Sequence, residues 1–160
     1  MIDARKLAAC GVFEGNVVVC GGWNNNFNFA KLNRLPTVES YDVTADEWSP
    51  MPDMIHGKSE HKLIVVRNKM IVMGMGRDNC EIFDSNCKMF VAFKSPQMYL
   101  NGLNKIVSIG NNIYVFLTVS TDLNKSETFV LRYDIDKGKW SIPDVQFNTK
   151  DFSCVKVPLL

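Results

Sequence analysis

The sequence repeats itself about three times, and this self-similarity limits the folds open to the chain more than any other feature. Each unit has two short apolar runs separated by a turn, then a polar loop, an aromatic–Asp pair and a final aromatic residue. The final aromatic residues are Trp48, Phe90 and Trp140, so successive units lie 42 and 50 residues apart. A period of about 40 to 50 residues is typical of propeller blades, each of which is one four-stranded sheet. We therefore expect about three four-stranded antiparallel blades.

Short runs rich in Val, Ile, Phe and Tyr supply the strands of these units, and Gly, Asn and Asp separate the runs. The clearest runs are Val17–Val19, Lys62–Val66, Met70–Met73, Ile113–Val119 and Thr128–Tyr133. Helical periodicity is almost absent, which predicts an all-β protein. We place blade 1 at about residues 5–52, blade 2 at 57–96 and blade 3 at 99–145. A closing C-terminal strand is expected at about 150–157.

The order of two strands, a double glycine, a long loop, an aromatic–Asp pair and a Trp resembles the kelch repeat. The matching residues are Gly21-Gly22, Tyr41-Asp42 and Trp48 in the first unit, Gly74, Phe83-Asp84 and Phe90 in the second, and Tyr133-Asp134 and Trp140 in the third. The segment Leu7–Gly15 is similar in style to the propeller of BTB-kelch (kelch-like) proteins. The resemblance implies a partial kelch propeller plus a closing strand.

These repeated residues have structural interpretations. The double glycine ends an inner strand where the backbone must turn tightly, which glycine permits. The Asp of each aromatic–Asp pair is expected to hydrogen-bond the backbone of the following turn. The aromatic rings suit contacts between blades.

Composition excludes several classes of function. The chain has 160 residues, a net charge of +1 and no run of Lys and Arg, so we expect no nucleic-acid or membrane partner. Five scattered cysteines fit reduced thiols in the cytoplasm better than a disulfide framework. The histidines are His56 and His61, without the Cys or carboxylate spacing of a metal site. We therefore predict no metal, no cofactor and no enzymatic activity.

The resemblance implies a module for protein–protein interaction. We expect the substrate-recognition propeller of a kelch-like adaptor for a cullin-based ubiquitin ligase, whose partner is a ubiquitination substrate. An actin-binding structural kelch protein is the alternative. A kelch-fold enzyme or sugar-binding protein is the less favoured third reading.

Binding is expected in the loops, because a propeller is a rigid scaffold that presents them. The longest loop runs over residues 23–37 and carries aromatic residues and Arg, which are enriched in binding hot spots. Basic residues before the first strand of a blade are a further expectation from the resemblance. The candidate binding residues are Arg5, Trp23, Asn25, Phe27, Arg34, Lys58 and Arg77.

Three blades leave the two ends of the array unprotected, because propellers normally protect their edges by closing the ring. We expect the chain to be the C-terminal part of a longer protein. The alternatives are self-association with a second copy to complete the ring, or a degenerate product that folds poorly.

Overall fold

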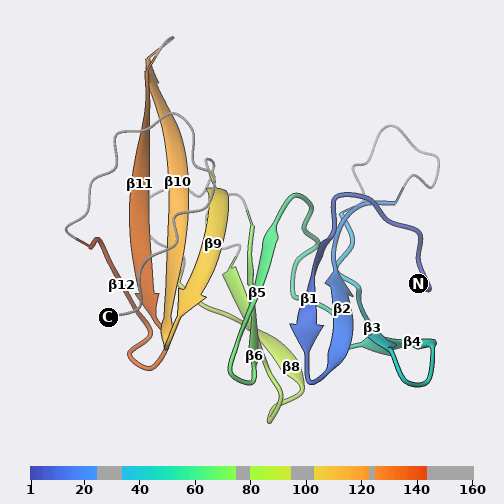
Figure 1. Ribbon diagram of the computed structural model, residues 1–160. Coiled ribbons are helices and arrows are strands. Elements are labelled where there is room, and N and C mark those ends of the chain that lie inside the picture. The colour runs from blue at the N-terminus through green and yellow to red at the C-terminus, as the bar shows by residue number, and fades with distance from the viewer. Residues whose placement is uncertain (25–33, 75–79, 95–102, 123–124, 144–160) are drawn as a thin grey trace. The chain divides into compact units, whose positions relative to one another are not determined.

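The structure is a computed structural model that describes residues 1–24, 34–74, 80–94, 103–122 and 125–143 (Figure 1). These residues form three antiparallel four-stranded sheets, and helix is absent from the ranges just given. The predicted all-β fold class, a partial kelch propeller, is confirmed. The expected closing strand at 150–157 lies outside the described residues. Within the described residues, no helix is long and apolar enough to cross a membrane.

Each sheet is formed by four strands that are consecutive in sequence and neighbours in the sheet. The first sheet contains β1 (Ala9–Phe13), β2 (Asn16–Cys20), β3 (Val38–Asp42) and β4 (Glu47–Met51). The second contains β5 (Lys62–Val66), β6 (Lys69–Met73), β7 (Cys80–Asp84) and β8 (Met89–Ala92). The third contains β9 (Leu103–Ile109), β10 (Asn112–Asp122), β11 (Lys125–Asp134) and β12 (Lys139–Ser141).

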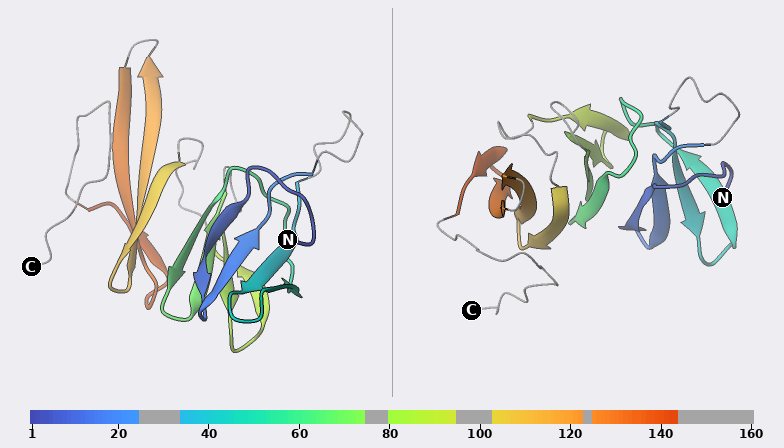
Figure 2. Two further views of the ribbon diagram at one scale, coloured as in Figure 1. Left: turned by 45° about the vertical axis from the view of Figure 1, so that its right-hand side comes forward. Right: turned by 90° about the horizontal axis from the view of Figure 1, so that it is seen from above.

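The chain divides into two compact units, Met1–Leu100 and Asn101–Leu160, so the first two sheets belong to one unit and the third sheet to the other. The third sheet differs from the first two in its long central hairpin. Its strands β10 and β11 have 11 and 10 residues, whereas β12 has only three (Figure 2).

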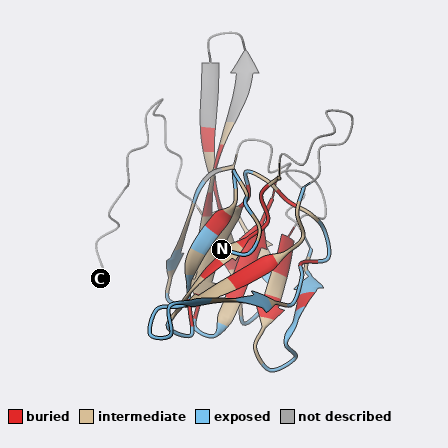
Figure 3. Cartoon of the chain, turned by 90° about the vertical axis from the view of Figure 1, so that its right-hand side faces the viewer, coloured by how far each residue is buried: buried red, intermediate tan, exposed pale blue. Residues whose placement is uncertain are grey.

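The first and second sheets share one hydrophobic core. Phe13 of β1 meets Phe83 of β7 edge to face, with ring centroids 5.8 Å apart. The innermost strands approach closely at Gly11, where a Cβ would lie 3.2 Å from Cδ2 of Leu63. Buried apolar residues complete this core (red in Figure 3): Ala9, Val18, Cys20, Val38, Met70, Val72 and Phe90 from the two sheets, and Met54 from the connection between them.

The aromatic–Asp pairs occupy the same place in all three sheets. The aromatic ring faces the ring of the outermost strand, at centroid distances of 5.1 Å for Tyr41–Trp48, 5.2 Å for Phe83–Phe90 and 4.9 Å for Tyr133–Trp140. Each Asp carboxylate accepts hydrogen bonds from the turn that follows. Asp42, for example, accepts them from the amides of Thr44 and Ala45. The sequence therefore predicted both the position and the role of these carboxylates.

Candidate functional site

The most distinctive exposed feature of the first sheet lies at the base of its long loop. Trp23 forms isolated β-bridges with Lys6 on one side and Arg34 on the other. The Lys6 ammonium lies 4.1 Å from the centroid of the Trp23 ring. Lys6 and Arg34 are exposed and Trp23 is half-buried. We call these three residues the loop-base cluster.

The double glycine holds the loop-base cluster in place. Gly21 and Gly22 both have positive φ, +61° and +89°, and a Cβ at Gly22 would lie 2.7 Å from the carbonyl oxygen of Lys6. This close approach lets the N-terminal segment pair with Trp23, whose amide donates to the Lys6 carbonyl at 2.9 Å. The Leu35 amide donates to the Gly22 carbonyl at 2.8 Å and fixes the far end of the loop. The backbone therefore fixes the base of the loop at both ends.

The chemistry of the loop-base cluster suits a peptide with negative charge and apolar side chains. A cation over an indole face is a favourable pair, and Trp and Arg are the residue types that dominate binding hot spots. The Lys6 ammonium lies over the indole face and Arg34 is the backbone bridge partner of Trp23, so two exposed cations that attract carboxylates flank one aromatic residue. Trp23 and Arg34 were predicted as binding residues, whereas Lys6 was missed because sequence alone does not bring it beside Trp23.

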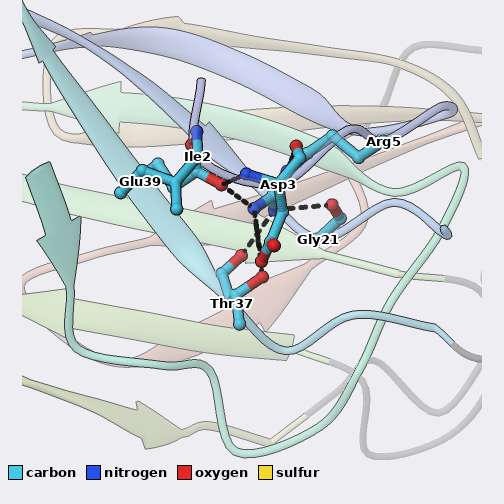
Figure 4. Close-up of polar contacts among 6 residues, drawn as sticks. All are labelled: Ile2, Asp3, Arg5, Gly21, Thr37 and Glu39. Carbon is cyan, nitrogen blue, oxygen red and sulfur yellow. Dashed lines mark hydrogen bonds and ion pairs between the residues drawn. The ribbon is translucent and has the colours of Figure 1, made fainter. Parts of the chain in front are cut away.

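The structure places Arg5 elsewhere than the sequence led us to expect. Its side chain is 1% exposed and forms a buried ion pair with Glu39 (Figure 4). The guanidinium also donates to the carbonyl oxygens of Gly21 and Thr37, at 3.0 and 2.9 Å. A cation that is enclosed in this way offers no surface to a partner. Arg5 therefore ties the N-terminal segment to β3 and to the double glycine.

Lys58 repeats this arrangement in the second sheet, and its predicted exposure is likewise corrected. Its side chain is 2% exposed and pairs with Glu81, which is fully buried. Each glutamate also accepts hydrogen bonds from an equivalent pair of backbone amides, which lie three and two residues before its cation. Glu39 accepts from Ile2 and Asp3, and Glu81 from Ile55 and His56.

Glu39 stays ionised in this buried position because it is surrounded by donors. Burial alone would raise the pKa of its carboxyl group. The amides of Ile2 and Asp3 and the Arg5 guanidinium outweigh that effect, so the pKa is lowered from its usual value. The same balance of charge and hydrogen bonds is what a buried ion pair needs to be tolerated.

A buried thiol and imidazole meet between the first and second sheets. Cys20 Sγ lies 3.3 Å from Nε2 of His61, and His61 is 3% exposed. Burial raises the pKa of Cys20 to about 12. Burial, followed by the nearby Lys58 cation, lowers the pKa of His61 to about 4. Both groups are therefore neutral near pH 7, and the thiol is not activated as a nucleophile.

The remaining predicted residues, Asn25, Phe27 and Arg77, lie outside the described residues. Among the residues that the structure describes, no group of three or more His, Cys, Asp and Glu is placed to hold a metal ion. The described candidates thus separate into an exposed pair, Trp23 and Arg34, and a buried pair, Arg5 and Lys58.

Comparison with known proteins agrees with the repeat. Residues 4–55 match the kelch motif. The Kelch repeat-containing protein kel-10 of Caenorhabditis elegans is 34% identical over 58 residues, which are 36% of this chain and 9% of that protein. The Kelch repeat and BTB domain-containing protein F47D12.7 of the same organism is 33% identical over 58 residues, again 36% of this chain and 9% of that protein. The chain thus aligns with only a small part of these relatives' length.

A solved structure shares the fold. The structure of YjhT, a kelch propeller, matches with a TM-score of 0.68 at 17% identity. The match covers 92% of this chain and 54% of the YjhT chain. Residues 4–55 thus carry a kelch motif, and the chain resembles kelch-repeat proteins, one of them a BTB-kelch protein.

Proposed function

We propose that this kelch-repeat chain is a protein-interaction module that binds an acidic segment of its partner through the loop-base cluster. Kelch repeats suggest an interaction propeller, and that general role is the premise of the proposal. The observation that carries the proposal is the Lys6 ammonium 4.1 Å from the Trp23 ring, with Arg34 bridged to the same residue. Backbone bridges hold the three residues side by side, so binding costs little ordering of the backbone.

The finer proposal is that the chain belongs to the substrate-recognition propeller of a kelch-like adaptor for a cullin-based ubiquitin ligase in the cytoplasm. Its support is the similarity to a relative whose name includes a BTB domain. In that setting the acidic segment would come from the ubiquitination substrate. A BTB domain encoded in frame with this sequence would support the adaptor, and its absence from the gene would count against it.

A peptide array of graded net charge tests the binding proposal. We expect the chain to retain acidic peptides, and we expect retention to fall as salt is raised, because exposed charges are screened. The double variant Trp23→Ala/Arg34→Glu should weaken binding by about tenfold or more, as expected for an aromatic and Arg hot spot.

The matched control is Lys139→Glu, which makes the same kind of charge change at an exposed residue of the third sheet. This variant should bind as the wild type does. Equal loss in both variants would mean that only net charge matters, and the loop-base cluster would be rejected. Co-sedimentation of the chain with filamentous actin would instead favour the actin-binding alternative.

A further inference from the structure

The connection between the first two sheets makes a turn that the second sheet holds in place. The turn spans residues 55–58, between β4 and β5, and we call it the clamped turn. The Glu81 carboxylate on β7 accepts hydrogen bonds from the amides of Ile55 and His56, at 2.7 and 3.2 Å. The same carboxylate pairs with the buried Lys58 ammonium. One buried side chain therefore fixes both ends of the turn.

The clamped turn is also bonded to the base of the long loop in the first sheet. The Lys58 amide donates to the Leu35 carbonyl at 3.3 Å, and the Gly22 amide donates to the Lys58 carbonyl at 2.7 Å. Leu35 directly follows Arg34, and Gly22 directly precedes Trp23. The turn and the loop base belong to the same compact unit. The clamped turn is thus joined to the neighbours of two members of the loop-base cluster.

Gly57 shows how close this approach is. A Cβ at Gly57 would lie 2.1 Å from the carbonyl oxygen of Arg34 and 3.2 Å from the Arg34 Cβ. The equivalent residue before the first sheet is Ala4, which precedes Arg5 as Gly57 precedes Lys58. Glycine in the clamped turn therefore removes the one atom that would push the turn away from the loop base.

Ile55 presents an apolar side chain from the clamped turn. It is 50% exposed. A single exposed aliphatic residue is common on protein surfaces and says little by itself. Ile55 differs because its amide is bonded to a buried carboxylate and its turn packs against Arg34. The backbone thus holds an apolar group next to a cluster that carries exposed cations.

We propose that Ile55 extends the loop-base cluster into one docking surface, where it contacts an aliphatic side chain of the acidic segment that Lys6 and Arg34 attract. The assignment rests on the proposed function and gives it a specificity, because the preferred segment then carries an aliphatic residue beside its acidic residues. Salt screens the attraction between charges, whereas burial of apolar surface does not depend on charge. The backbone of both parts is fixed before binding, so little order is lost.

Acidic peptides that carry one Leu or one Ser at each position in turn test this specificity. Fluorescence anisotropy measures the Kd of each labelled peptide for the 160-residue chain. At the best position we expect Leu to bind about tenfold more tightly than Ser, because its side chain is removed from water against Ile55. This ratio should persist at high salt, although both affinities fall. Equal affinity of Leu and Ser peptides at every position would overturn the proposal.

Ile55→Ser tests the apolar contact itself. It should abolish the preference for Leu and leave the affinity for the Ser peptides unchanged. The matched control is Val43→Ser, because Val43 is also an exposed aliphatic residue, 61% exposed, in the turn between β3 and β4. The control should keep the wild-type preference. A preference that survives Ile55→Ser, or that Val43→Ser removes equally, would reject Ile55 as the contact.

Gly57→Ala tests whether the turn has to pack against the loop base. The added Cβ pushes the turn away from the Arg34 carbonyl while Ile55 and the loop-base cluster keep their side chains. The preference for Leu should fall several-fold, and an unchanged preference in the folded variant would contradict the docked turn. Far-ultraviolet circular dichroism and urea denaturation check that each variant is folded. If Gly57→Ala does not fold, Ile55→Ser decides the question.

The apolar contact and the proposed function fail in different ways. Binding of acidic peptides without any preference for Leu rejects the contact of Ile55 and leaves the proposed function intact. Failure to bind any acidic peptide rejects the proposed function, and the contact with it. Salt-dependent binding whose preference for Leu disappears in Ile55→Ser supports both.

Discussion

At the scale of single residues, the buried cation–glutamate pair is a second repeating signature of this chain. Arg5–Glu39 and Lys58–Glu81 occupy equivalent places, with each glutamate two residues before the strand aromatic, Tyr41 or Phe83. In the third sheet the equivalent residue is Leu131, which is 3% exposed. The sequence also has no Lys or Arg in the segment Tyr99-Leu100-Asn101 before that sheet. Cation and carboxylate are thus replaced together, as expected when either one alone would be costly to bury.

Removal of one partner of this pair should be strongly destabilising. Arg5→Ala leaves the Glu39 carboxylate buried without its cation, and we expect a loss of about 3 to 5 kcal/mol in the free energy of unfolding. The double variant Arg5→Leu/Glu39→Leu should recover most of that loss, because it imitates the apolar solution of the third sheet. Urea denaturation followed by circular dichroism measures both values. A loss below about 1 kcal/mol for Arg5→Ala, as for an exposed ion pair, would contradict burial of the pair.

His61 should make stability depend on pH in a range where carboxylates contribute little. Its pKa is lowered from 6.5 to about 4 in the folded chain, so the unfolded chain binds the proton first as pH falls. Stability should therefore be constant above pH 6.5 and decrease between pH 6.5 and 4, by up to about 3 kcal/mol. Glu39 acts at lower pH, because its pKa is lowered and its stabilisation is lost only below the usual Glu range.

The measurement is the melting temperature as a function of pH for the wild type and His61→Gln. The variant should lose most of the decrease between pH 6.5 and 4.5. His56→Gln is the control, because the His56 side chain is 58% exposed and should keep the wild-type dependence. An unchanged pH profile in His61→Gln would rule out this histidine as the source.

At the scale of strands and turns, the sequence predicted most of what the structure shows. Local alternation and β-propensity located the strands, and the turn chemistry of Asp is local as well. The positions of Arg5 and Lys58 could not be read in the same way, because their partners lie 34 and 23 residues further along the chain. The available signal was the glutamate two residues before Tyr41 and Phe83, together with its loss at Leu131.

The turn after β11 provides a test at this scale. The Asp134 carboxylate accepts hydrogen bonds from the amides of Asp136 and Lys137, at 3.1 and 3.0 Å. Asp134→Ala removes both and should lower the free energy of unfolding by about 1 kcal/mol. Asp134→Asn retains an acceptor oxygen and should lose less. Chemical denaturation distinguishes the two, and equal losses would mean that charge, not turn bonding, sets the effect.

At the scale of the whole molecule, the three sheets have the strand order of kelch blades, and the fold match covers 54% of one solved chain. Val17, Tyr41 and Trp48 of the first sheet are half-buried, whereas their equivalents Met70, Phe83 and Phe90 in the second sheet are buried. This feature could not be predicted from the sequence of the strands. Both sets consist of one aliphatic and two aromatic residues, so only the packing distinguishes them.

The bridge between Trp23 and Arg34 has a consequence for how the protein could diversify. It closes the long loop at its base, so β2 and β3 keep their register whatever sequence connects these two residues. Loop length itself is inexpensive, at about 0.6 kcal/mol for each doubling. We therefore expect the residues between Trp23 and Arg34 to tolerate changes of sequence and length. The proposed peptide binding predicts that a library at positions 25 to 33 changes which peptides are bound while β2 and β3 keep their pairing.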